Sequence, residues 1–202
     1  MEHLIIPENY SSALNLHDTQ IGIKTVKDFF QSLLVRHLNL LRVSAPLFVD
    51  PASGMNDNLN GYERPVSFGI LEQNDYRAEV VQSLAKWKRY ALKEYGFSLG
   101  EGLYTDMNAI RRDEELDNLH SIYVDQWDWE KVITAKDRTL PFLQETVRDI
   151  VDAVCSTADE LRWKFPELKA IRLTREPTFI TTQELEDLYP DLTPKERENA
   201  FT

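Results

Sequence analysis

The sequence is poor in glycine and cysteine, and each shortage excludes a class of functional site. With seven glycines in 202 residues, it contains neither a Walker loop nor a G-x-G-x-x-G run, so the common glycine-rich phosphate cradles are excluded. The single cysteine, Cys155, rules out an intrachain disulfide framework. Cys155 lies in an apolar helical stretch, where a small buried hydrophobe is more frequent than a reactive thiol.

Motifs for metal binding and for serine nucleophiles are also missing. The histidines show no metal-ligand spacing with one another or with Cys155, and no G-x-S-x-G elbow occurs. Residues 50–65 are rich in Gly, Asn and Pro and predict a loop. This loop is not a calcium site, because its glycine and glutamate are misplaced for one. The chain's own residues therefore predict no metal site.

Long apolar runs and a basic leader are absent. The N-terminus MEHLIIPENY is not a signal peptide, and no segment reaches the roughly 18 apolar residues of a membrane span. We therefore expect a soluble, cytoplasmic protein with no membrane partner. The net charge of −11 repels phosphate backbones, so nucleic acid is not an expected partner. The length and a hydrophobic share of 42% suit one globular domain.

Helical periodicity predicts two long helices, at 23–41 and at 139–165. His37 falls on the apolar stripe of the first and is expected to be an interior histidine rather than a ligand. Pro141 in the first turn of the second is typical of a helix start.

Shorter helices are predicted from their capping residues. Ser83 is expected to cap a helix that runs to Tyr95, with Gly96 as its stop. Capping boxes at 181–184 and 193–196 predict two more helices near the C-terminus.

Runs with period-two alternation predict strands at four places: 43–49, 66–70, 78–81 and around Phe179. Pro46 places the first strand at an edge or a bulge, where another surface often arrives. A long hairpin follows, and its return strand is LHSIYVDQWDWE, residues 119–130. In that strand Trp127 and Trp129 share one face and Gln126 and Asp128 share the other. The tryptophans suit a core, but an amide beside a carboxylate needs a polar partner.

Other polar residues gain interest from their positions. Lys88 falls inside the apolar stripe of the helix from Ser83, so it either snorkels to the surface or points inward at an anion. Asp57 lies in the loop, and Arg111, Arg112 and Glu114 lie where the hairpin's first strand ends. Taken singly, a solvated group is the favoured interpretation for the loop and hairpin residues, whereas both interpretations of Lys88 are open.

The order of these elements resembles the first two motifs of the class II aminoacyl-tRNA synthetase fold. QSLAKWK (82–88) is similar to the QSPQLxK segment of aspartyl- and asparaginyl-tRNA synthetases, and IRRDEE (110–115) to the arginine-x-glutamate signature. The resemblance is closer to ammonia-dependent asparagine synthetases (aspartate–ammonia ligases) and covers nearly all of the chain from about residue 20. Their characteristic runs are present in order: NDNLNG (56–61), SLAKWKR (83–89), GEGLYT (100–105), LHSIYVDQWDWE (119–130) and YPDL (189–192).

The resemblance implies an α+β fold, in which a class II synthetase-like antiparallel sheet is flanked by helices. Residues 1–19 are then an N-terminal extension, and residues 20–202 are a partial, truncated catalytic domain. Chains of the family run further, so the C-terminal strands and the glycine-rich third motif are expected to be missing. The family also implies a homodimer formed through the helix 23–41 and the strand around Pro46.

The function that the resemblance implies is ATP-dependent ligation of L-aspartate and ammonia to L-asparagine, with AMP and pyrophosphate as products and Mg²⁺ as the cofactor of ATP. The enzyme would form a β-aspartyl-adenylate. The family's residues carry over to these positions: catalytic Asp57, Arg111 and Gln126; aspartate-binding Ser83, Lys88, Gln126 and Asp128; ATP-binding Arg111, Glu114 and Ser121.

Each carried-over role has a physical reason. Arg111 suits the α-phosphate because a guanidinium neutralises the charge that builds there. Gln126 would donate to the activated carboxyl group and Asp128 would accept from the α-ammonium. Asp57 is the candidate base for the ammonium proton. Arg112 remains an alternative to Arg111, because spacing to the glutamate of the broader signature favours it.

Two other functions compete with the ligase. The chain would fit a catalytically inactive homologue that binds aspartate or a partner, or a relative of the aspartyl-tRNA synthetases that acts on tRNA. The acidic balance and the absence of an anticodon-binding domain count against the second.

Overall fold

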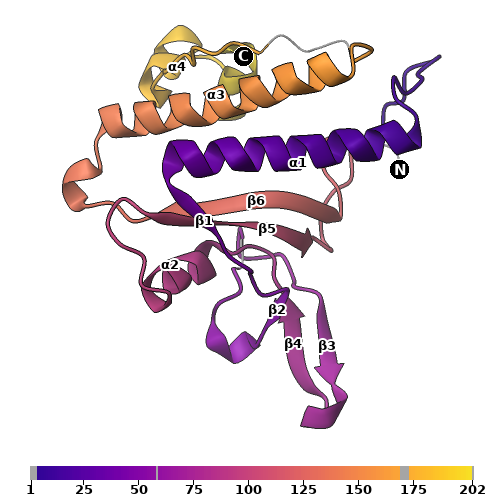
Figure 1. The fold of residues 1–202 in the computed structure, drawn as a ribbon, viewed down its shortest axis with the longest axis vertical. Coiled ribbons are helices and arrows are strands. Elements are labelled where there is room, and N and C mark those ends of the chain that lie inside the picture. The colour runs from indigo at the N-terminus through magenta and orange to yellow at the C-terminus, as the bar shows by residue number, and fades with distance from the viewer. Residues whose placement is uncertain (1–3, 58, 169–172, 202) are drawn as a thin grey trace.

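Two long helices and a three-stranded sheet form the larger part of the fold in a computed structural model, which describes residues 4–57, 59–168 and 173–201. Helices α1 (Leu16–Leu38) and α3 (Leu140–Lys164) lie side by side across one face of the sheet, and α2 (Ala85–Glu94) lies against the opposite face (Figure 1). The sheet contains, in spatial order, β1 (Leu40–Arg42), β5 (Gly102–Ile110) and β6 (Tyr123–Lys131). This mixture of helices and sheet confirms the α+β prediction.

A second, smaller antiparallel sheet projects away from the first (Figure 1). Its strands are, in spatial order, β2 (Phe48–Val49), β4 (Tyr76–Val80) and β3 (Ser67–Ile70). Short 3₁₀ turns occur at Pro51–Ser53, Leu71–Gln73 and Ala135–Asp137. Helices α4 (Thr182–Leu188) and α5 (Pro194–Phe201) complete the described chain above α3 in Figure 1. Of the sequence-based expectations, Asn58 of the run 56–61 and the ends of the segments 1–19 and 20–202 fall outside the described residues.

The predicted hairpin is the backbone of the larger sheet. Strands β5 and β6 pair antiparallel over nine positions, from Gly102 opposite Lys131 to Ile110 opposite Tyr123. Gly102 is the point where three strands meet, because a Cβ there would lie 2.5 Å from the Glu130 carbonyl oxygen and 2.6 Å from a Leu40 methyl. No larger residue fits without displacing β6 or β1.

The two faces of β6 differ as its alternation predicts. On the helix-pair side, Trp127 packs against Phe30 with ring centroids 4.7 Å apart, and Trp129 borders the same core. On the α2 side, Val124 borders a second core built around Leu84 and Met107. Gln126 and Asp128 face this second side, so the β6 face toward α2 is the one that carries the polar groups.

Helix ends depart from the predicted ranges where local capping decides them. Helix α1 begins earlier than expected because the Asn15 side chain accepts from the Asp18 N–H, and it ends at Leu38 because Asn39 is left-handed (φ 56°). Leu41 therefore belongs to β1. The Ser83 cap is wrong: Leu84 occupies the N-cap position, and the Ser83 hydroxyl accepts from the Ala85 N–H at 3.2 Å.

The other helix predictions are confirmed. Thr139 caps α3 with Pro141 in the first turn, and Gly96 follows α2 with φ +70°. The capping boxes at 181–184 and 193–196 form, with reciprocal hydrogen bonds between the threonine and the glutamate of each.

Only the end of the strand predicted at 43–49 forms, as β2, because residues 43–47 connect the two sheets. After β1 the Val43 N–H donates to the Tyr104 carbonyl, and the chain then leaves for β2 across Pro46, which has no N–H to donate. The strands at 66–70 and 78–81 are confirmed as β3 and β4. No strand occurs around Phe179 in residues 173–201; its ring lies under the Arg148 guanidinium instead, 5.3 Å away.

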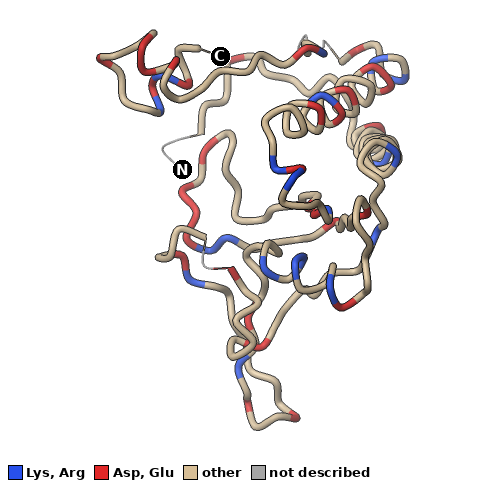
Figure 2. The backbone as a smooth tube through the Cα atoms, turned by 90° about the vertical axis from the view of Figure 1, so that its left-hand side faces the viewer, with Lys and Arg blue, Asp and Glu red and all other residues tan. Residues whose placement is uncertain are grey.

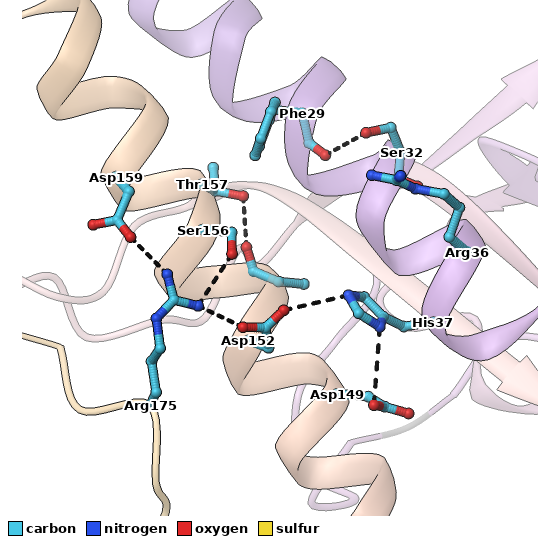
Figure 3. Close-up of polar contacts among 11 residues, drawn as sticks. Phe29, Ser32, Arg36, His37, Asp149, Asp152, Ser156, Thr157, Asp159 and Arg175 are labelled. Atoms are coloured by element: carbon cyan, nitrogen blue, oxygen red, sulfur yellow. Dashed lines mark hydrogen bonds and ion pairs between the residues drawn. The ribbon is translucent and has the colours of Figure 1, made fainter.

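His37 is not an interior histidine. Its side chain is 30% exposed and lies between two aspartates of α3, with Nε2 3.5 Å from Asp152 and Nδ1 3.9 Å from Asp149 (Figure 3). Asp152 also pairs with Arg175, which in turn bonds Asp159 at 2.6 Å. The rim of the apolar stripe thus meets a polar network that ties α1, α3 and the segment after residue 172 together.

Lysine and arginine are interleaved with aspartate and glutamate along most of the backbone, including the long helices (Figure 2). No helix among the described ranges is long and apolar enough to cross a membrane.

Candidate active site

Lys88 is held inside the protein by α2 and points at β6. Its side chain is 7% exposed because Leu84 and Trp87 anchor this helix in the core. The ammonium forms an ion pair with Asp128 and donates to the Trp129 carbonyl at 3.0 Å. Its nitrogen does not reach the surface, so the snorkelling interpretation does not hold.

Two further charged side chains, Glu130 and Arg89, lie beside the Lys88–Asp128 pair. The Glu130 carboxylate lies 3.8 Å from the Lys88 ammonium and 3.8 Å from the Arg89 guanidinium. The group of two cations and two anions is neutral overall. A neutral, partly buried group of this kind can open to admit a ligand that carries both an ammonium and a carboxylate. The ammonium of the ligand then pairs with an anion of the group and its carboxylate with a cation, so no charge is left uncompensated.

Gln126 lies on the same face as Asp128, two residues and therefore about 7 Å along the strand. Its side-chain N–H donates to the Met107 sulfur at 3.2 Å, and Met107 is itself buried. A thioether is a weak acceptor, so this contact holds the amide loosely. Gln126 is therefore ready to exchange the sulfur for a stronger acceptor such as a carboxylate.

Asp57 and Ser83 meet at the start of α2, where the Ser83 hydroxyl donates to the Asp57 carboxylate at 3.4 Å. Asn56 fixes this loop: it is buried, accepts from the Gln82 N–H at 2.9 Å and donates to the Val80 carbonyl at 3.2 Å. The loop is thus tied to the chain between β4 and α2.

A cavity of about 690 Å³ opens beside the end of β5. Its walls include Tyr62, Gln82, Arg111, Arg112, Glu114 and His120. This volume is in the range of small-molecule and cofactor sites. Two of the carried-over residues, Arg111 and Glu114, therefore line a space large enough for a nucleotide.

Most acidic groups in the cavity wall already have partners. A hydrogen bond from Arg64 to Asp113, 3.0 Å from Nε, lowers the pKa of this carboxyl to about 2. A hydrogen bond with His120 likewise lowers the pKa of Asp117 to about 2 and raises the pKa of the histidine above 6.5. Because these carboxylates are already paired, less negative charge remains to neutralise the other cationic side chains of the hairpin loop.

Arg111 is only weakly restrained. Its backbone N–H donates to the Ile122 carbonyl at 2.8 Å, but its guanidinium lies 3.9 Å from Glu114. Its Nε is buried without a hydrogen-bond partner among the described residues. Arg112 is more exposed and lies 4.0 Å from Asp113, which Arg64 already holds. The structure therefore distinguishes the two arginines by burial, although both line the cavity.

The structure divides the carried-over residues into two neighbouring groups. Arg111 and Glu114 line the cavity, whereas Lys88, Gln126 and Asp128 follow the face of β6. The Asp57–Ser83 pair lies next to the cavity-lining Gln82. Ser121 is exposed and is not among the residues that line the cavity.

Sequence reasoning assigned no role to most of the cavity wall, including Gln82 and His120. Both belong to the quoted runs QSLAKWK and LHSIYVDQWDWE, so their place in a motif was the only available signal. Within the described ranges, no group of three or more His, Cys, Asp or Glu side chains is arranged to hold a metal ion.

Comparison with known sequences gives a consistent result. A family model described as "Aspartate-ammonia ligase" matches residues 17–202. An aspartate–ammonia ligase of Clostridium perfringens is 58% identical over 201 residues, which are 100% of this chain and 60% of the relative. One from Levilactobacillus brevis is 57% identical over 200 residues, 99% of this chain and 59% of the relative. The chain thus spans about 60% of the length of the curated relatives it matches.

Solved structures show the same fold at low identity. Asparaginyl-tRNA synthetase of Pyrococcus horikoshii, complexed with asparaginyl-adenylate, superposes with a TM-score of 0.58 at 19% identity, over 84% of this chain and 37% of that one. The Entamoeba histolytica enzyme, also with asparaginyl-adenylate, gives 0.54 at 14% identity, over 98% and 46%. The class II aminoacyl-tRNA synthetase-like fold expected from the motifs is thereby confirmed.

Proposed function

Because the chain belongs to the aspartate–ammonia ligase family, we propose that it contributes to the ATP-dependent synthesis of L-asparagine from L-aspartate and ammonia. The observation that carries the proposal is the presence of two polar environments on one hairpin. The Lys88–Asp128 pair and Gln126 lie on the α2 face of β6, and a cavity lined by Arg111 lies where β5 ends. Amino-acid recognition and phosphate chemistry need these two environments.

Aspartate is recognised by charge exchange in this proposal. The substrate's α-ammonium takes the place of Lys88 beside Asp128, and Lys88 turns to a substrate carboxylate. Gln126 leaves the Met107 sulfur and donates to the carboxyl group that reacts. Ser83, whose hydroxyl donates to Asp57 at 3.4 Å, is proposed as a further contact of the aspartate substrate. Each protein contact of the ligand-free state is thus replaced by a contact of the same polarity.

In the first step, an oxygen of the β-carboxylate attacks the α-phosphorus of ATP. An oxygen–phosphorus bond forms, the bond to the pyrophosphate leaving group breaks, and β-aspartyl-adenylate results. Arg111 neutralises the negative charge that builds on the phosphate oxygens. Glu114 and Ser121 are proposed as further nucleotide contacts, the first from the cavity wall and the second from the exposed start of the return strand.

In the second step, ammonia attacks the acyl carbon of the adenylate. A carbon–nitrogen bond forms, the acyl–oxygen bond breaks, and AMP leaves with the electron pair. Ammonia arrives mainly as ammonium, so a base must take a proton before or during the attack. Asp57 fills this role in the proposal, since the 3.4 Å contact from Ser83 is the one hydrogen bond to its carboxylate among the described residues.

Magnesium is proposed only as the ion that accompanies ATP. The described residues offer no cluster of three suitable side chains, and the carboxylates of Asp113 and Asp117 are already bonded to Arg64 and His120. The described residues do not fit a protein-bound Mg²⁺ site, so no step is derived through the metal.

Residues 20–202 are proposed as part of a catalytic domain that extends further in the relatives, with 1–19 as an N-terminal extension. Among the described strands, β6 pairs on one side only, with β5, and so presents a free edge to further strands.

We also propose a homodimer that functions in the cytoplasm, where ATP is available. The connection around Pro46 supports a dimer, because Leu47 and Phe48 are 57% and 47% exposed there and nearby Leu41 is 62% exposed. Apolar side chains gathered in this way favour a protein partner.

Product analysis tests the proposed function. Aspartate, ATP and ammonium are supplied to the chain alone and to the chain together with the part of the C. perfringens relative that this chain does not cover. Asparagine, AMP and pyrophosphate in equal amounts, in either sample, support the ligase. Aspartate binding without AMP in both samples would establish the inactive homologue instead. Aspartylation of tRNA would indicate the synthetase.

A further inference from the structure

Two buried polar atoms in the cavity wall have complementary needs. The side-chain oxygen of Gln82 and the Nε of Arg111 are both inaccessible to solvent, and neither has a hydrogen-bond partner among the described residues. Gln82 is 1% exposed, and both residues line the same cavity of about 690 Å³. An oxygen can only accept and an Nε–H can only donate, so each atom is the kind of partner that the other lacks.

Such atoms are costly in a resting protein, because each has lost its water without gaining a protein contact. The Gln82 side chain has little freedom to rotate, since it is 1% exposed and its backbone N–H donates to buried Asn56 at 2.9 Å. Arg111 can move more: its backbone is fixed, but the one ion pair of its guanidinium within the described residues is the 3.9 Å contact to Glu114. A modest rotation of the arginine is therefore the easier way to satisfy both atoms.

We propose that Gln82 is a positioning residue for Arg111 and that a bound nucleotide brings the two into hydrogen-bond contact. The inference rests on the proposed function, in which the two outer nitrogens of the guanidinium face the α-phosphate. That orientation leaves Nε–H on the opposite edge, where the Gln82 oxygen accepts it.

The neutral side chain of Gln82 suits this role better than a carboxylate. Glu114 would orient the guanidinium but would also cancel the charge that the phosphate needs. An amide oxygen orients without neutralising, so the full positive charge remains directed at the developing oxyanion. The pairing of a fixed amide with a loosely held arginine is therefore a device for aligning charge.

Pyrophosphate exchange in the assembled protein tests the coupling. Gln82→Met keeps the side-chain volume and removes the acceptor; we expect the exchange rate to fall on the order of 10- to 100-fold, with the KM for aspartate unchanged. In an Arg111→Lys background, which has no Nε–H, Gln82→Met should cost nothing more. Multiplied losses in the double variant would overturn the proposal.

A matched control separates positioning from packing. Thr157→Val removes another buried polar group, on α3 and bonded only to the Ala153 carbonyl of its own helix. It should lower the thermal midpoint without changing the exchange rate. A comparable loss of rate in this variant would show that Gln82→Met acts through general destabilisation, and the proposal would fall.

The Arg111 Nε–H signal in NMR spectra separates this inference from the proposed function. It is assigned by its absence from Arg111→Lys and observed with saturating ATP and no aspartate, so that no turnover is needed. Slower exchange with water on adding ATP, lost in Gln82→Met, supports the pairing even if the protein makes no asparagine. If the variant does not fold, the wild type decides: equally fast exchange with and without ATP rejects the pairing.

Discussion

Lys88 and Asp128 form a partly buried ion pair that joins helix α2 to strand β6. The sequence placed both residues in one substrate pocket, yet here each is the other's partner. An ion pair with little solvent exposure keeps both groups charged and pre-aligned, at the cost of their hydration. A substrate with one ammonium and a suitably placed carboxylate satisfies both residues at once, whereas a neutral amino-acid side chain leaves Lys88 unpaired.

Lys88→Met is expected to weaken aspartate binding far more than ATP binding. The variant keeps the apolar stem but removes the ammonium, so aspartate loses a charge-assisted contact, which corresponds to roughly 10- to 100-fold in affinity. It also leaves the Asp128 carboxylate without its cation, so the thermal midpoint should fall. Separate titrations with aspartate and with ATP measure the two effects.

Lys93→Met is the control for that experiment, because Lys93 is exposed in the last turn of the same helix. It should leave both affinities unchanged. Equal losses of aspartate and ATP binding in Lys88→Met would identify a merely structural lysine and remove it from the proposed pocket.

Arg111→Ala is expected to abolish adenylate formation without unfolding the protein. The loss should be on the order of 100- to 1000-fold, as for other groups that stabilise charge in a transition state. Its side chain contributes little to stability in the resting state, since the one ion pair that it makes among the described residues, with Glu114, is 3.9 Å long. Pyrophosphate release with aspartate and ATP measures the step, and circular dichroism checks the fold.

Arg112→Ala decides between the two adjacent arginines. Arg112 lies 4.0 Å from an aspartate that Arg64 already bonds, so its removal should change the rate a few-fold at most. Normal pyrophosphate release by Arg111→Ala, with a large loss in Arg112→Ala, would reverse the assignment.

Asp57→Asn is expected to separate the two steps of the reaction. Asparagine retains an acceptor for the Ser83 hydroxyl but cannot take a proton from ammonium, so amide formation should fall roughly 100-fold or more. Adenylate formation, measured by pyrophosphate exchange, should persist. Asp50→Asn, at the other end of the loop and still able to accept from the Ala52 N–H, is the control. A parallel loss of both steps in Asp57→Asn would exclude the base assignment.

The central hairpin was predictable from sequence because its alternation is unambiguous. Trp127 and Trp129 can only be accommodated on a core face, which forces Gln126 and Asp128 to the other. Helix α3 and the capping boxes were also predictable, because their signals lie within short stretches of sequence. The connection around Pro46 was not, because its alternating residues continue across a change of sheet, and sheet membership depends on distant partners such as Tyr104.

The site was predictable only where a motif carried it. Arg111 and Lys88 were found through resemblance, since each has a common surface explanation when taken alone. Gln82 was missed, because the buried Val81 before it and Leu84 two residues after it give the segment an apolar character. Only the structure shows that its oxygen is buried without a partner among the described residues and shares a cavity with Arg111.

The Asp117–His120 pair makes the hairpin loop sensitive to pH at both ends of the range. The pKa of Asp117 is lowered from 3.8 to about 2, so its contribution to stability is present above 3.8 and is lost as the pH falls toward 2. The pKa of His120 is raised above 6.5, so its contribution is complete below 6.5 and is lost as the pH rises through the raised value. The pair is therefore strongest between these limits.

Asp117→Asn is expected to return the pKa of His120 toward 6.5, because the hydrogen bond and charge of Asp117 are the two largest causes of the shift. Titration of the histidine ring protons by NMR measures it directly. An unchanged His120 titration in the variant would show that another group, such as Glu114, raises the pKa of the histidine.

A protonated His120 in the cavity wall adds a positive charge beside Arg111. Nucleotide affinity should therefore decline above the raised pKa of His120 in the wild type. In Asp117→Asn the decline should occur at a lower pH.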